Sequence, residues 1–117
     1  GSAFLATEES RAAAEYKQMI VESSASDIVY SNLFTGIHGN YLRGSIEAAG
    51  LNPDDLPVSD PTAMDFGSGG GADSKAWRDI WGAGQGVGAV TSTGSVRDLV
   101  ERLRAEYEQA ASALAAR

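Results

Sequence analysis

The sequence contains no cysteine, one histidine and only three prolines among its 117 residues. Without cysteine the chain has no disulfide and no thiolate chemistry, which fits a reducing compartment, and we expect a cytoplasmic protein. One histidine without a cluster of soft ligands argues against a zinc site, because such sites take several Cys or His ligands. We therefore predict no metal centre.

Positive charge and long apolar runs are also scarce. Nine Lys and Arg residues stand against 16 Asp and Glu residues, which gives a net charge of −7. Because no basic face is available to neutralise phosphates, we expect no nucleic-acid partner. No apolar run approaches the roughly 20 residues that cross a bilayer, so we expect no membrane partner. With 43% hydrophobic residues the chain is typical of globular protein.

Three segments have the apolar spacing of helices. The first covers 8–23, with Thr7 as the predicted N-cap. The second covers 40–49, and Gly50 follows it in the place of a left-handed cap. The third covers 95–116, where Ser95 is the predicted N-cap.

The segments between these helices contain little strand signal. Residues 27–30 form one short β-prone run, and 87–90 are predicted to be extended. Residues 51–74 hold all three prolines and read as one long loop, and Ser74 can cap a short helix that continues to Trp81. The sequence thus predicts a mainly α segment with too few strands for a sheet, typical of the outer layer of a larger protein.

The most informative motif follows Trp81, where four glycines occur within the seven residues 82–88. Glycines allow a backbone to approach another group closely. Gln85 among them offers donors and an acceptor to a polar heterocycle, beside the apolar ring of Trp81. This combination of residues is typical of a loop that contacts a ring-shaped cofactor. The same spacing also fits a tight turn between two packed elements, which is the commoner structure.

Other polar residues are weaker candidates. His38 lies in a glycine-bearing segment and could act as a general base, although a solvated loop position is the commoner role. Tyr16 is expected to pack, and Lys17 to be solvated. The loop aspartates are too scattered for a calcium loop.

Four stretches taken together resemble the nitronate monooxygenase (2-nitropropane dioxygenase) family of FMN-dependent TIM barrels. They are Gly1-Ser2-Ala3-Phe4-Leu5-Ala6-Thr7-Glu8-Glu9-Ser10, Tyr16-Lys17-Gln18, Phe34-Thr35-Gly36 and Trp81-Gly82-Ala83-Gly84-Gln85-Gly86. Their order spans nearly the whole chain and matches the C-terminal segment of such a protein. Where the family commonly has a Pro-Ala-Arg run after Phe-Thr-Gly, this chain has Ile37-His38-Gly39-Asn40.

The resemblance implies the C-terminal part of an α/β (TIM) barrel. Residues 1–23 would be the end of the eighth βα unit, and 24–117 a helical C-terminal extension over the catalytic face. Gly1 and Ser2 would bind the phosphate of FMN through backbone N–H groups. Trp81, Gly84 and Gln85 would border the flavin or substrate pocket. The catalytic base would lie in the N-terminal barrel portion of the same protein, which is the expected partner.

The implied activity is oxidation of a nitronate, a small-molecule substrate, with oxygen. Related barrels reduce enoyl thioesters or quinones with NAD(P)H, and this segment does not separate the two activities. A third possibility is a non-catalytic helical interaction module with an acidic surface. Such a module would ignore added FMN.

Overall fold

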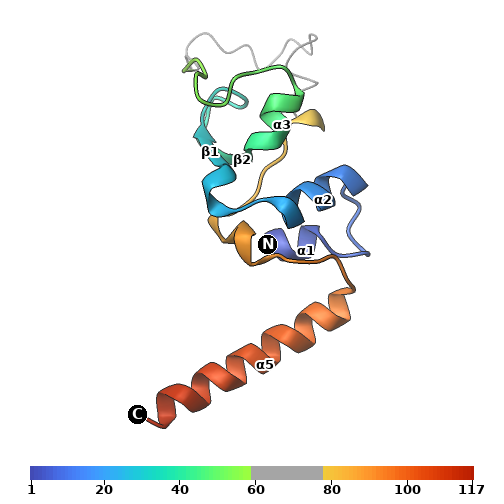
Figure 1. Ribbon diagram of the computed structural model, residues 1–117, viewed down its shortest axis with the longest axis vertical. Helices are drawn as coiled ribbons and strands as arrows, with labels where there is room; N and C mark the ends of the chain where they lie inside the picture. Colours follow the sequence, from blue (N-terminus) through green and yellow to red (C-terminus); the bar gives the residue numbers. More distant parts are fainter. Residues whose placement is uncertain (59–77) are drawn as a thin grey trace.

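The computed structural model describes residues 1–58 and 78–117. This part of the chain is mainly helical and contains one two-stranded sheet. Figure 1 shows the sheet and α3 at one end, α1 and α2 in the middle, and α5 at the other end. The molecule is elongated, with principal extents of 56 × 31 × 25 Å.

The first predicted helix is shorter than expected. α2 covers Ala14–Glu22, so the prediction of a helix over 8–23 is wrong for residues 8–13, and a separate short helix, α1 (Ser2–Leu5), precedes them. Thr7 does not cap α2; it is buried, and its hydroxyl donates to the Phe4 carbonyl at 2.7 Å. The Glu8 N–H donates to the Gly94 carbonyl at 2.8 Å, so a long-range backbone pairing replaces the helix at this point.

The sheet contradicts the expectation that no sheet would form. β1 (Ile28–Ser31) confirms the predicted short strand, and it pairs antiparallel with β2 (Gly39–Leu42). The predicted helix over 40–49 is wrong for its first three residues, because they belong to β2. Leu42 is fully buried at the end of that strand, so tertiary packing has overridden its local helical spacing.

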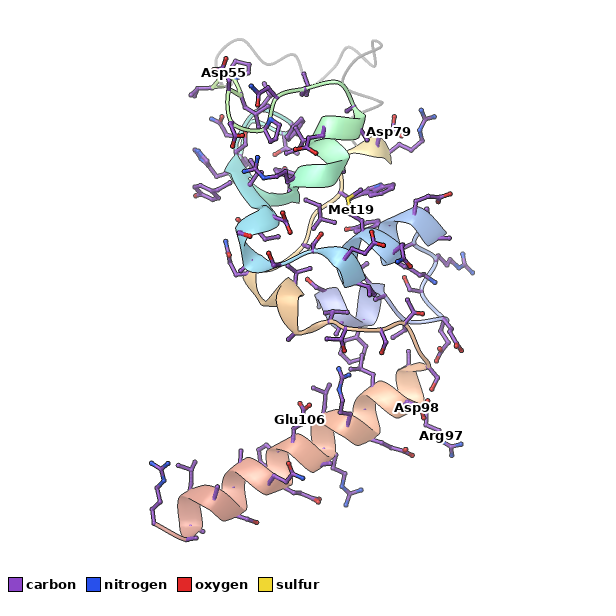
Figure 2. The ribbon with its side chains drawn as sticks, viewed as in Figure 1. Met19, Asp55, Asp79, Arg97, Asp98 and Glu106 are labelled. Carbon is purple, nitrogen blue, oxygen red and sulfur yellow. The ribbon has the colours of Figure 1, made fainter. Side chains whose placement is uncertain are left out.

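α3 (Arg43–Ala48) forms the remainder of that predicted helix. Gly50 ends it at φ +85°, which confirms the left-handed cap. Figure 2 shows Met19 directed from α2 toward α3. A Cβ at Gly44 would lie only 3.1 Å from the Met19 sulfur, so the absence of a side chain at Gly44 allows the two helices to approach.

Residues 87–89 are helical where an extended chain was predicted. A 3₁₀ helix, η2, covers Gln85–Ala89, and another, η1 (Ala25–Asp27), lies between α2 and β1. Short 3₁₀ turns tolerate glycine because they are only a few residues long. η2 packs inward through a single buried side chain, Val87. This side chain belongs to the main core cluster, which consists of Ala6, Ile20, Leu42, Val87 and Val90.

α5 (Val96–Ala115) confirms the last predicted helix. Ser95 caps it as expected, since its hydroxyl accepts a hydrogen bond from the Asp98 N–H at 3.1 Å. The carboxylate of Glu9 also accepts from the Val96 N–H, at 2.9 and 3.1 Å from its two oxygens. The C-terminal half of α5 extends away from the body (Figure 1).

Most of the predicted long loop and of the helix from Ser74 lies outside the described residues. The described residues 51–58 contain no helix or strand. Arg78 and Asp79 are helical, whereas Trp81 is not, so the predicted helix ends before that residue.

Candidate functional site

The N-terminal residues and the glycine loop meet directly. The Gly84 N–H donates a hydrogen bond of 2.8 Å to the Ser2 hydroxyl, across 82 positions of sequence. Both residues line a cleft of about 480 Å³, together with Gly1. Three of the five predicted site residues therefore come together at one place, although they were assigned from opposite ends of the sequence.

Helix α5 supplies the charged wall of this cleft through Arg102 and Glu106, with Leu103 between them. The Arg102 Nε lies 3.7 Å from a Glu106 carboxylate oxygen. Figure 2 shows Glu106 on the side of α5 that faces the body. By their spacing in the sequence, these charges fall on the polar face of an amphipathic helix. Their helical spacing gave no signal that the N-terminal residues would pack beside them.

The glycine loop is fixed to the sheet by its backbone. The Leu42 N–H donates to the Trp81 carbonyl at 2.7 Å, and Gly82 forms an antiparallel bridge with Tyr41. A Cβ at Gly82 would lie 3.3 Å from the Asn40 carbonyl oxygen, so this glycine permits a close backbone approach. By contrast, a Cβ at Gly86 would meet no atom within 4 Å. The loop therefore needs glycine at its start more than at its end.

Trp81 does not line the cleft that contains Gly84. Its ring stacks on that of Tyr16, with centroids 4.9 Å apart and planes 3° from parallel. The Trp81 indole N–H donates to the Arg78 carbonyl at 2.9 Å. The Tyr16 hydroxyl donates to the Gly82 carbonyl oxygen. Burial raises the pKa of Tyr16 above its ordinary value of 10.0.

These rings line a second cavity, of about 260 Å³, with Phe34, Thr35, Tyr41, Ile80 and Gly82. Sequence reasoning missed Phe34 and Tyr41 as lining residues, although it had noted the Phe-Thr-Gly motif. The structure thus separates the predicted pocket residues into two sites. Gln85 is exposed at the start of η2 and lines neither cavity.

The weaker candidates lie elsewhere. His38 is exposed, and its ring stacks on Tyr30 with centroids 4.6 Å apart. Lys17 donates to the Ser10 carbonyl at 2.8 Å and so supports the connection between α1 and α2. Among residues 1–58 and 78–117, no group of three or more His, Cys, Asp or Glu residues could hold a metal ion.

No helix in the described ranges is long and apolar enough to cross a membrane.

Comparison with known proteins gives one structural likeness. No family model matches the chain, and no curated protein matches it. A solved structure of a FabK point mutant from Thermotoga maritima matches with a TM-score of 0.62 and 21% identity. The match covers 97% of this chain and 35% of the FabK chain. The fold is therefore that of part of a TIM-barrel enzyme, and this chain spans about a third of the length of that relative.

Proposed function

We propose that this chain is the C-terminal portion of an FMN-dependent oxidoreductase built on a TIM barrel. The observation that carries the proposal is the hydrogen bond between Ser2 and Gly84. It joins two stretches that each resemble the same flavoprotein family and that lie at opposite ends of the sequence. The fold likeness to FabK agrees with this, because it covers 97% of this chain and about a third of a TIM-barrel enzyme.

The residues at the cleft fit one end of FMN, its phosphate. The N–H groups of Ser2 and Ala3 have no acceptor among the described residues. Such amides can donate to phosphate oxygens. A Cβ at Gly1 would meet no atom within 4 Å, so space is open beside them. The described residues do not form a complete FMN site, and the remainder would come from the barrel.

In this proposal FMN supplies the redox chemistry, and the residues of this chain bind and orient it. The Ser2 and Ala3 amides hold the phosphate end. The Ser2 hydroxyl holds the Gly84 amide, which fixes the glycine loop beside the phosphate. Gln85, exposed on that loop, is positioned to meet a group contributed from outside this chain. It remains our predicted flavin or substrate contact.

Two substrate classes fit this proposal. Nitronate oxidation with oxygen follows from the sequence resemblance. Enoyl thioester or quinone reduction with NAD(P)H is the alternative that the same resemblance leaves open. The two differ in the electron donor, since nitronate oxidation takes electrons from the substrate and enoyl reduction takes them from a nicotinamide.

The barrel portion of the same protein is the proposed partner of α5. The apolar side chains of this helix remain exposed, by 48% at Val100, 43% at Leu103, 76% at Tyr107 and 71% at Leu114. They follow one another at intervals of three, four and seven residues, so they form one stripe. In a TIM barrel, helices cover the strands with such stripes.

The test uses the intact protein that carries this segment. We expect it to purify with bound FMN and to turn over either a nitronate with oxygen or an enoyl thioester with NAD(P)H. Ser2→Pro removes both the hydroxyl and the amide N–H, whereas Ser2→Ala removes only the hydroxyl. Proline is tolerated at the first position of a helix, so Ser2→Pro should weaken FMN binding more than Ser2→Ala while the protein stays folded. Equal FMN affinity in the two variants would place the phosphate elsewhere.

The alternative, a non-catalytic interaction module, predicts the opposite results. It would fold as a stable monomer without any barrel and would leave the fluorescence of added FMN unchanged. An intact protein without flavin and without either activity would favour the module and would overturn the proposed function.

A further inference from the structure

Four of the seven described residues that line the second cavity are aromatic. Four different segments supply these rings. Tyr16 comes from α2, Phe34 from the segment that follows β1, Tyr41 from β2, and Trp81 from the position before the glycine loop. These rings form two ordered pairs. Tyr16 stacks on Trp81, and Phe34 meets Tyr41 edge to face, with centroids 5.0 Å apart and planes at 70°. Such geometry is favourable for aromatic pairs and holds the walls in fixed orientations.

The polar atoms of these walls are mostly engaged within the protein. The Tyr16 hydroxyl donates to the Gly82 carbonyl, and the Trp81 indole N–H to the Arg78 carbonyl. The Thr35 hydroxyl donates to the Ile37 carbonyl at 2.9 Å. Among the described residues that line the cavity there is no Lys, Arg, Asp, Glu or His. An anionic ligand would therefore lose hydration without gaining a cationic partner from these residues.

The volume of this cavity is large enough for one aromatic ring of a ligand. An apolar protein cavity of about 150 Å³ can bind benzene. A cavity of about 260 Å³ therefore has room for a ring with a small substituent. Aromatic walls favour a planar guest, because ring faces and edges attract one another beyond simple burial of area.

We propose that this cavity, lined by Tyr16, Phe34, Tyr41 and Trp81, is a binding site for an uncharged aromatic ring. The inference does not rest on flavin binding, because the described residues that line this cavity differ from those that line the cleft of Ser2 and Gly84. It assigns to the chain a recognition site for a planar apolar group of a small molecule.

The experiment measures ligand binding to the full chain through the fluorescence of Trp81. The background substitution Trp77→Phe leaves Trp81 as the single tryptophan. Toluene is the main probe, cyclohexane is a non-planar probe of similar size, and benzoate is a charged one. We expect saturable binding of toluene, with affinity for cyclohexane and benzoate at least about threefold weaker. No saturable response to toluene, or equal affinity for toluene and cyclohexane, would overturn the proposal.

A matched pair of variants locates the bound ring. Phe34→Leu keeps an apolar side chain but removes a ring from the cavity wall. Tyr30→Leu removes a ring that is 70% exposed and lines no part of this cavity. We expect Phe34→Leu to weaken toluene binding roughly three- to tenfold and Tyr30→Leu to leave it unchanged. Circular dichroism checks that both variants are folded. Equal losses in the two folded variants would contradict a site at this cavity.

Discussion

Ser2 accepts a hydrogen bond from the Gly84 amide although 82 positions separate the two residues in sequence. This hydrogen bond holds the N-terminal segment against the glycine loop. It also gives the serine side chain a structural role, whereas the sequence had suggested a role for the backbone N–H alone.

The first prediction concerns this hydrogen bond. Ser2→Ala should lower the free energy of unfolding by about 0.5–1.5 kcal/mol, because the Gly84 N–H loses its acceptor. Gly84→Ala is the matched control. Its new Cβ would lie 3.5 Å from the Ser2 hydroxyl oxygen, an ordinary contact, and its N–H is retained. Urea unfolding of both variants measures the difference. A larger loss in Gly84→Ala than in Ser2→Ala would show that loop shape matters more than this hydrogen bond.

Local signals predicted the elements that depend on local chemistry. Ser95 caps α5 and Gly50 ends α3 as expected, because caps are decided by a few adjacent residues. β2 was missed because its pairing with β1 and with Gly82 is decided by residues far away in sequence. The site shows the same division. The glycine loop was recognisable, but its contact with Ser2 and the aromatic cavity both depend on long-range packing.

The second prediction concerns the pH dependence of stability. Because the folded chain holds the Tyr16 proton more tightly than the unfolded chain, this group contributes stability that is fully present below pH 10.0. That contribution is lost as the pH rises through the raised pKa of the folded state. Tyr16→Phe should therefore reduce the loss of stability above pH 10.0, although it costs about 1 kcal/mol at neutral pH through the lost bond to Gly82.

Thermal unfolding between neutral pH and pH 11 measures this effect. Tyr107→Phe is the control, because its ring is 76% exposed on α5. The control should lose stability at high pH to the same extent as the unaltered chain. If Tyr16→Phe follows the same alkaline profile as the control, burial of the Tyr16 hydroxyl is not linked to stability.

The third prediction concerns the anchor of α5. The Glu9 carboxylate accepts from the Val96 N–H, and this contact lies where a negative charge also favours the helix N-terminus. Glu9→Ala should cost about 0.5–2 kcal/mol and increase amide hydrogen exchange in the first turn of α5. Glu8→Ala is the matched control, because Glu8 contributes its backbone N–H to Gly94. Equal exchange in the two variants would contradict a role for the Glu9 carboxylate.

The fourth prediction concerns the exposed stripe of α5. Without a barrel to cover it, this apolar surface should drive the isolated chain to associate with itself. The double variant Tyr107→Ala/Leu114→Ala removes two of the most exposed side chains of the stripe, at 76% and 71%, and retains strong helix formers. Burying one such side chain stabilises a contact by about 1.5–3 kcal/mol. The double variant should therefore weaken self-association by roughly tenfold or more.

Gln109→Ala is the control for this variant, because it places alanine on the polar face of the same helix without changing the net charge. Sedimentation equilibrium of the three chains gives the dissociation constants. The control should associate like the unaltered chain, since the stripe remains intact.

If the unaltered chain is a monomer at high concentration, the exposed stripe is not enough to drive association. The same result would weaken the argument that α5 requires a barrel, because the stripe would then be stable in water. If both variants lose association equally, the contact instead involves the polar face, and the partner of α5 would have to be sought there.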